Sequence, residues 1–217
     1  MKRIIIVEDD RLILELVTDF LIASGKFTAI IPFHTGTDFL EGIEKGLIAD
    51  LILLDFRLGD MKALDILSFL EKNKVMIPVM VLTSHYEEYL IGYMIKNGVA
   101  AYLPKNIPPS HLIEAIDEVI RKGHYIMKEQ FPYLKTSFSE GNQEKKKADL
   151  TAREIDVIYL LANQMTAKEI AEKLFLAPKT VEGYKNNLFV KTGTRSVVGL
   201  VLFAIQNGFI EAESIQL

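Results

Sequence analysis

The chain has 217 residues, of which 49% are hydrophobic and 25% are charged, and its formal net charge is −4. These values are typical of a globular protein of one large or two ordinary domains. They exclude a broadly basic nucleic-acid-binding protein but not a local basic face. Because the sequence contains no cysteine, disulfides and thiolate metal sites are also excluded.

The N-terminal region gives no sign of export or membrane insertion. No apolar stretch reaches the roughly 20 residues that a membrane-spanning helix needs. A signal peptide would need a basic region, a longer apolar region and a cleavage site of small residues, whereas this chain enters a strand-like run at once. We therefore expect a cytoplasmic protein with no membrane partner.

Residues 1–123 alternate between strand-like and helical patterns, which predicts a first domain of the α/β class. Short runs rich in β-branched and other apolar residues alternate with helical spacing that ends at glycine. The expected strands are Lys2–Val7, Thr28–Ile31, Asp50–Leu54, Ile77–Leu82 and Ala100–Leu103. The expected helices are Arg11–Ser24, Thr37–Lys45, Ala63–Asn73, Tyr86–Asn97 and Pro109–Lys122. The pattern predicts a doubly wound, five-stranded parallel sheet.

The remaining sequence divides into a linker and a second domain. Residues 124–148 are polar and weakly periodic, which favours a linker. Residues 149–217 are helical in pattern, and we expect an all-α domain there. Its helices are expected from Thr151 to Ala162, over Ala167–Phe175, from near Pro178 to Lys191, and over Arg195–Asn207.

Acidic residues, a hydroxyl and a lysine follow four of the expected strands. They are Glu8, Asp9, Asp55, Thr83 and Lys105. In doubly wound sheets the ligand crevice lies outside the carboxyl ends of the strands, so these groups are expected to converge there. Carboxylates without His or Cys favour Mg²⁺, which binds together with phosphate. A lysine and a hydroxyl can then contact phosphoryl oxygens, and Asp55 is the candidate nucleophile.

This set resembles the CheY-like receiver domain of bacterial two-component response regulators, in residue order and approximate spacing. The resemblance implies that Asp55 accepts a phosphoryl group from a sensor histidine kinase, with Thr83 and Lys105 assisting. It implies metal ligation by Glu8, Asp9, Asp55 and the backbone carbonyl of Arg57. It also implies a switch formed by Thr83 and Tyr102. Asp10 is expected to cap the next helix instead.

Two positions in the loop after Asp55 depart from the receiver pattern. The family usually has proline where Gly59 stands and glycine where Ala63 stands. The loop after Asp55 is therefore expected to be more flexible than in relatives. Neither change removes a reactive group.

In the second domain, two helices joined by a short turn have helix-turn-helix spacing. The second of them carries an exposed polar face over Lys179–Lys191. Lysines can contact DNA phosphates, while Asn186 and Glu182 can address base edges. Gly183 costs about 1 kcal/mol of helix stability relative to alanine, which a close approach of DNA or a tight internal contact would explain. The DNA-binding candidates on this helix are Lys179, Thr180, Glu182, Gly183, Lys185, Asn186 and Lys191.

This half resembles the LuxR-type helix-turn-helix of NarL-like regulators. The matching segments are 150–154, 168–171, 179–182 and 191–196. Lys168, on the preceding helix, is added to the DNA-binding candidates. The resemblance implies binding to double-stranded DNA as a homodimer when phosphorylated, with RNA polymerase as a further partner. Glu182 stands where many relatives carry lysine, which leaves the base preference open.

The sequence therefore predicts a two-component response regulator that regulates transcription. It is not expected to be an enzyme, beyond Mg²⁺-dependent gain and loss of its own phosphoryl group. A phosphorylation-independent DNA-binding regulator or a protein-interaction adaptor is the alternative. A metal-dependent phosphohydrolase fits less well, because Arg57 stands where a second acid would be needed.

Overall fold

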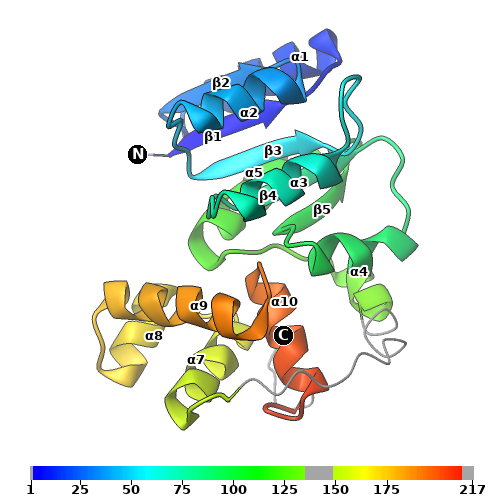
Figure 1. Ribbon diagram of the computed structural model, residues 1–217. Coiled ribbons are helices and arrows are strands. Elements are labelled where there is room, and N and C mark those ends of the chain that lie inside the picture. The colour runs from blue at the N-terminus through cyan, green and yellow to red at the C-terminus, as the bar shows by residue number, and fades with distance from the viewer. Residues whose placement is uncertain (1, 135–148, 212–217) are drawn as a thin grey trace. The chain divides into compact units, whose positions relative to one another are not determined.

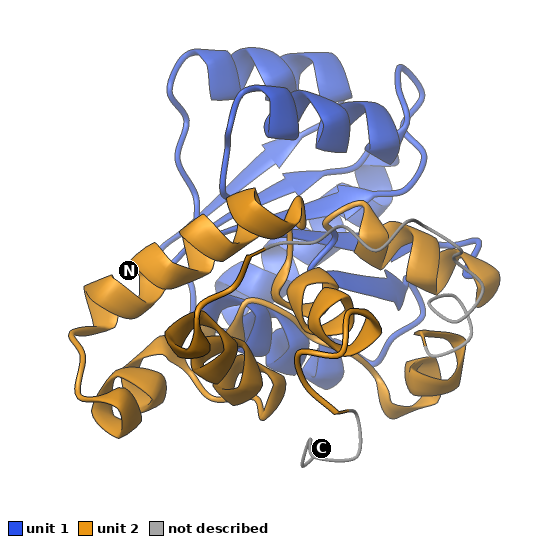
Figure 2. Ribbon diagram, turned by 60° about the horizontal axis from the view of Figure 1, so that its bottom comes forward, with its two compact units in different colours: residues 1–87, 99–120 blue, residues 88–98, 121–217 orange. Residues whose placement is uncertain are grey.

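The computed structural model describes residues 2–134 and 149–211. It divides into two compact units, one of residues 1–87 and 99–120 and the other of residues 88–98 and 121–217 (Figure 2). The division places the segment 88–98 with the helical unit. The domain bounds inferred from the sequence, 1–123 and 149–217, stay a prediction.

The first unit is built on a five-stranded sheet in the order β2-β1-β3-β4-β5, in which all neighbouring strands are parallel (Figure 1). Its strands are β1 Arg3–Val7, β2 Ala29–Phe33, β3 Leu51–Asp55, β4 Val79–Thr83 and β5 Ala101–Pro104. Its helices are α1 Arg11–Ala23, α2 Gly36–Glu44, α3 Ala63–Lys72 and α5 Pro109–Lys122. The predicted doubly wound fold is confirmed, although β2 lies two residues later at its C-terminal end than its pattern indicates.

The central strands are buried because their sequence is apolar on both faces. Every residue of β3 and β4 is buried, as expected for a parallel sheet that is covered by helices on both sides. Helices α2 and α3 cover one face of the sheet, and α1 and α5 cover the other (Figure 1). Because all five strands are parallel, their carboxyl ends lie at one edge of the sheet, between the two helical layers.

Short polar side chains fix where the helices begin. Asp10 caps α1, and its carboxylate accepts hydrogen bonds from the backbone N–H groups of Leu12 and Ile13 at 2.9 and 3.2 Å. The predicted capping role of Asp10 is thus confirmed. Thr35 caps α2 in the same way. These caps satisfy N–H groups that have no partner inside a helix.

The second unit contains α4 Tyr89–Lys96, the 3₁₀ helix η1 Lys128–Gln130, α7 Ala152–Ala162, α8 Ala167–Leu174, α9 Pro178–Thr192 and α10 Val197–Gln206. α4 begins three residues later than predicted. Capping boxes open α7 at Thr151 and α8 at Thr166, and proline stands in the first turn of α9. α7 to α10 enclose a common apolar core.

The region between the two predicted domains is described only in part. Residues 128–134 are helical, with Gln130 and Leu134 buried, where the sequence predicts a linker. The rest of that segment, residues 135–148, lies outside the described residues. In the described part of the chain no single helix is long and apolar enough to cross a membrane. α9 and α10 reach the required length and composition only as a pair bent by 57°.

Candidate functional site

The carboxyl edge of the sheet brings together the polar residues that follow separate strands. Glu8 follows β1, Asp55 ends β3, Thr83 ends β4 and Lys105 follows β5. Asp55 pairs in register with Leu82 on the neighbouring strand, which places Thr83 one residue further along. Glu8, Asp55 and Thr83 are buried. The sequence prediction that these groups meet at one edge is thus confirmed by the sheet order.

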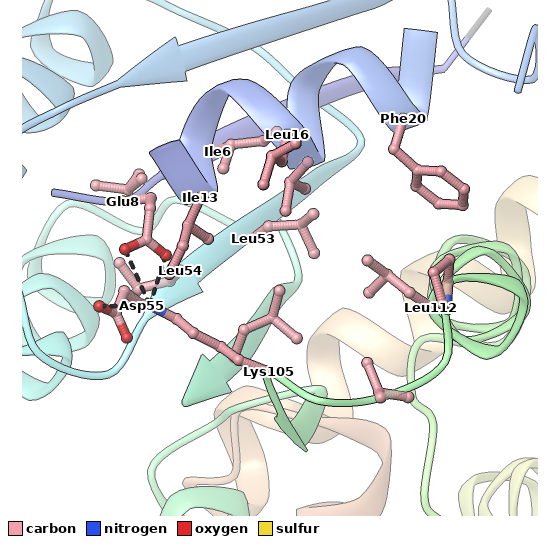
Figure 3. A pocket seen from close by; sticks show the side chains of 15 residues that line it. Ile6, Glu8, Ile13, Leu16, Phe20, Leu53, Leu54, Asp55, Lys105 and Leu112 are labelled. Atoms are coloured by element: carbon pink, nitrogen blue, oxygen red, sulfur yellow. Dashed lines mark hydrogen bonds and ion pairs between the residues drawn. The ribbon is translucent and has the colours of Figure 1, made fainter. Parts of the chain in front are cut away.

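Lys105 joins the two buried acids. Its ammonium lies 2.7 Å from Oε2 and 2.9 Å from Oε1 of Glu8, and 3.0 Å from Oδ2 of Asp55 (Figure 3). The side chains are almost enclosed, so solvent screens these ion pairs less than it screens pairs at the surface. Lys105 is thereby fixed between the ends of β1 and β3.

Burial and charge act against each other in this cluster. Desolvation raises the pKa of Glu8, and the neighbouring Asp55 charge raises it further, so that the pKa stays above its ordinary value despite the hydrogen bond from Lys105. For Lys105 desolvation lowers the pKa, but the hydrogen bonds to Glu8 and Asp55 outweigh it and the pKa is raised. The lysine therefore stays charged, while the acids share one cation between them.

A third carboxylate makes the cluster fit a metal ion. Ligand oxygens of Glu8, Asp9 and Asp55 all lie within 4.8 Å of one another, and Asp9 is exposed to solvent. Three oxygen donors with an open side suit a hard divalent cation that retains water molecules. Arg57 lies in the adjoining loop, where its backbone pairs with Lys62. The metal contact of the Arg57 carbonyl stays a prediction.

An aromatic cluster surrounds the predicted switch residue Tyr102. Its ring is fully buried, stacks on Tyr86 at a centroid distance of 5.3 Å and meets Phe56 edge-on at 6.3 Å. The backbone N–H of His85, next to Tyr86, donates to the Thr83 hydroxyl at 3.1 Å. Sequence reasoning misses Tyr86 and Phe56. The sequence offers only their positions as a clue to this role: Phe56 directly follows Asp55, and Tyr86 lies three residues after Thr83.

An apolar cavity of about 390 Å³ adjoins the charged cluster. Glu8, Asp55 and Lys105 close one end of it, and Phe20 of α1 and Leu112 of α5 lie at the other end (Figure 3). The apolar lining contributes to the desolvation of the acids at its end.

The predicted DNA-binding residues lie on α8 and α9 of the second unit. Val181 and Leu188 of α9 are buried, and Tyr184 packs against the same core. The opposite face is exposed, except that Lys185 is half-buried. The exposed candidates are Lys168, Lys179, Thr180, Glu182, Gly183, Asn186 and Lys191.

The lysines of this face differ in their surroundings. Lys185 is paired with Glu182 at 2.7 Å, and Lys191 is paired with the buried Glu154 at 2.8 Å. Among the described residues, no ion pair involves Lys168 or Lys179. The face is therefore less basic than its lysine content indicates. DNA contacts at all eight positions stay predictions.

The comparison with known protein families agrees with both halves of the structure. Residues 4–117 match the model of the response regulator receiver domain, which is more than half of the chain. The chain belongs to the response regulator family. Residues 148–204 match the model of the bacterial regulatory proteins of the luxR family.

Relatives match this chain over most of its length. The response regulator GacA of Pseudomonas aeruginosa is 26% identical over 215 residues, which cover 99% of this chain and all of GacA. UvrY of Escherichia coli is 28% identical over 167 residues, which cover 76% of this chain and 77% of UvrY. The structure of an RcsB–DNA complex matches with a TM-score of 0.55 at 18% identity, over 94% of this chain and 98% of RcsB. The last match concerns the fold alone.

In this response regulator the loop after Asp55 is held by several contacts, although the sequence predicts a looser loop from Gly59 and Ala63. The Asp60 carboxylate accepts hydrogen bonds from the backbone N–H groups of Gly36 and Thr37 at 3.0 and 2.9 Å, and from the Thr37 hydroxyl at 2.8 Å. Desolvation raises the pKa of Asp60, but these hydrogen bonds outweigh it and the pKa is lowered. Asp60 thus ties the loop to the N-terminus of α2.

We predict that Asp60→Ala lowers the free energy of unfolding at neutral pH by about 0.5–1 kcal/mol, the lower range for a lost helix cap at an exposed site. Because the pKa of Asp60 is lowered in the folded state, its contribution is complete above the ordinary value of 3.8. It is lost as the pH falls through the lowered pKa. Urea unfolding at pH 7 and at pH 3 measures this, and the gap between the variant and wild type should shrink at pH 3. An equal gap at both pH values would contradict the assignment.

Proposed function

We propose that this response regulator accepts a phosphoryl group on Asp55 from a sensor histidine kinase and regulates transcription by binding double-stranded DNA. The proposal assigns residues 1–123 to the receiver domain, 124–148 to the linker and 149–217 to the DNA-binding domain, in the cytoplasm. The observation that carries it is the contact of Lys105 with both Glu8 and Asp55, beside Asp9, at the carboxyl edge of the sheet.

The cluster supplies the groups that phosphoryl transfer to a carboxylate needs. One Asp55 oxygen forms a bond to phosphorus while the bond from phosphorus to the donor nitrogen breaks, and that nitrogen keeps the electron pair. Lys105 holds a positive charge within reach of Asp55 to offset the charge on the transferring group. The Thr83 hydroxyl can donate to a phosphoryl oxygen.

The acids fit Mg²⁺, with Glu8, Asp9, Asp55 and the Arg57 carbonyl as ligands. When bound, the ion neutralises charge on the phosphoryl oxygens. The chain's own part is to hold Asp55 beside the other proposed metal ligands and within reach of Lys105. Hydrolysis of the resulting acyl phosphate returns Asp55 to a carboxylate, so the only catalysis proposed is gain and loss of the chain's own phosphoryl group.

Phosphotransfer to Asp55 is tested with Mg²⁺ and a small phosphodonor such as acetyl phosphate. We predict one added phosphoryl mass in the wild-type chain and none in Asp55→Asn, because an amide oxygen is too weak a nucleophile. Intact-protein mass spectrometry measures the adduct. Asp50→Asn is the matched control, in which the adduct should persist. Asp50 precedes the same strand at its other end, where its carboxylate accepts a hydrogen bond from the backbone N–H of Arg3. A wild-type chain without an adduct would favour a phosphorylation-independent regulator or an adaptor.

A switch around Thr83 and Tyr102 would report the phosphorylated state. Thr83 turns toward the phosphoryl group, and this movement strains the hydrogen bond that its hydroxyl accepts from His85. Tyr86 follows His85 and stacks on Tyr102, so the displacement reaches the buried ring. Phosphorylation is a local charge event that needs such a two-state element to be felt elsewhere.

The exposed face of α9 is the proposed DNA-reading surface. Lys168, Lys179 and Lys185 would contact phosphates, and Thr180, Glu182 and Asn186 would face base edges. RcsB, which shares the fold, has been studied in a complex with DNA. A homodimer of the phosphorylated chain would place two α9 helices on half-sites about one helical turn apart. RNA polymerase is the further partner proposed for the bound state.

Gly183 gives a test of this surface with two readouts of opposite sign. Apart from its two chain neighbours and the backbone of its own helix, no atom of the described residues lies within 4 Å of a Cβ placed on Gly183. A tight contact with another part of the described structure therefore does not explain the glycine. We predict that Gly183→Ala raises the free energy of unfolding by about 1 kcal/mol. DNA affinity should fall by about tenfold, because the methyl group occupies space that the DNA backbone or a base edge needs. The stability gain, from thermal unfolding, shows that the fold is intact when fluorescence anisotropy reports weaker binding. A stabilised variant with unchanged affinity would remove Gly183 from the DNA surface.

A further inference from the structure

A buried glutamate connects the first turn of α7 with the C-terminal half of α9. The Glu154 side chain is only 4% exposed, although glutamate is seldom buried unless it is paired. Its carboxylate lies beside two residues of α9 that are one helical turn apart, Asn187 and Lys191. The capping-box pattern in the sequence predicts the contact of Glu154 with Thr151, but not its contacts with Asn187 and Lys191.

Both oxygens of the Glu154 carboxylate are occupied. Oε1 lies 2.8 Å from the Lys191 ammonium and accepts from the Asn187 amide at 3.2 Å. Oε2 accepts from Lys191 at 2.9 Å, from the Thr151 backbone N–H at 2.9 Å and from the Thr151 hydroxyl at 3.1 Å. Desolvation raises the pKa of Glu154, but the Lys191 and Thr151 hydrogen bonds outweigh it and the pKa is lowered. The buried charge is therefore well satisfied.

Arg153, which precedes Glu154 in the first turn of α7, contacts α8, the first helix of the helix-turn-helix. The Arg153 guanidinium donates to the backbone carbonyl of Leu174, the last residue of α8. α8 and α9 are joined by residues 175–177, of which Phe175 has a left-handed φ of 55°. The first turn of α7 thus contacts the end of α8 and the second half of α9 through two adjacent side chains.

Lys191 cannot pair with a DNA phosphate without weakening its ion pair with Glu154. If Lys191 turned to a phosphate, Glu154 would keep a buried charge with fewer donors, which is costly in a protein interior. The backbone oxygen of Asp149 also lies 3.5 Å from the Lys191 ammonium. These contacts favour the intramolecular position over a phosphate contact.

We propose that Glu154 and Lys191 are positioning residues that fix α9 against α7 for DNA binding, and that Lys191 makes no phosphate contact itself. The inference rests on the proposed DNA-binding function and revises one of its sequence-predicted contacts. Asn187 supports the pair from the preceding turn of α9. Lys179 lies at the N-terminal end of α9 and forms no ion pair among the described residues. Its predicted phosphate contact is kept.

The salt dependence of DNA binding separates the two roles of a lysine. Each phosphate contact contributes about 0.9 to the slope of log affinity against log salt, whereas a positioning residue changes affinity without changing the slope. The full-length chain is measured with and without acetyl phosphate. The probe is a duplex of about 30 base pairs, enriched from a randomised library by the wild-type chain, which has room for two half-sites one turn apart.

Four variants are compared: Lys191→Met, Glu154→Gln, the double variant Glu154→Gln/Lys191→Met, and Lys179→Met as the control. We expect Lys191→Met to lose about tenfold in affinity with the wild-type slope. The double variant should recover most of that loss, because no buried charge is left unpaired. Lys179→Met should lower the slope by about 0.9. Urea unfolding runs in parallel, where Lys191→Met should show the lowest midpoint and the double variant a higher one.

A different pattern overturns the inference. If Lys191→Met and the double variant lose affinity equally and both lower the slope by about 0.9, Lys191 is a phosphate contact. If Lys191→Met is too unstable to measure, the slope of the double variant decides alone. A wild-type chain that retains no duplex at any salt concentration would overturn the proposed DNA-binding function together with the inference, whereas a slope change at Lys191 overturns the inference only.

Discussion

The ion pairs of Lys105 with Glu8 and Asp55 are the interaction on which the first unit depends. Two acids at adjacent strand ends repel each other and are costly to bury, and one lysine from the last strand offsets both costs. This is achieved only if β1, β3 and β5 end at the same edge of the sheet, so the strand order and the site require each other. Three acids, Glu8, Asp9 and Asp55, face a single lysine, so the cluster keeps negative charge that a cation could neutralise. Asp9 lies at its open side. A site in that state is suited to take up a metal ion and then a phosphoryl group.

The second unit uses a buried glutamate in the opposite way. Glu154 has one lysine to itself and accepts further hydrogen bonds from Thr151 and Asn187, so its pKa is lowered. Glu8 shares its lysine with Asp55 and lies at the end of an apolar cavity, so its pKa is raised. The same pair of residue types therefore gives a cluster in which two acids share one lysine in the first unit, and a glutamate with a lysine of its own in the second. The difference comes from the number of acids per lysine and from the additional side-chain donors, Thr151 and Asn187, that Glu154 has, rather than from burial alone.

Much of the fold could be predicted from the sequence, because apolar runs and glycine stops reflect strand and helix lengths directly. The convergence of Glu8, Asp55, Thr83 and Lys105 followed from one rule, that parallel strands end at one edge. Contacts between side chains far apart in the chain could not be predicted in this way. The pairing of Lys191 with Glu154 joins residues 37 positions apart, and in the sequence Lys191 is simply one more lysine of a basic helix. Likewise Asp60, which has no periodic signal, secures a loop whose composition alone predicts mobility.

The energies involved explain why a phosphoryl group at Asp55 would alter the surroundings of Tyr102. An aromatic stack such as that of Tyr86 on Tyr102 contributes about 0.5–1.5 kcal/mol beyond its buried area, and a hydrogen bond such as that from His85 to Thr83 contributes about 1 kcal/mol. An acyl phosphate at Asp55 carries nearly two negative charges in place of the single carboxylate charge, together with strong acceptor oxygens, and hydrogen bonds to charged groups contribute about 1.5–3 kcal/mol each. One such bond from Thr83 is therefore enough to offset the loss of the neutral contacts around it. Because His85, the donor of that hydrogen bond, directly precedes Tyr86, whose ring forms the stack, a movement of this segment would change both contacts together, which is what a two-state element requires.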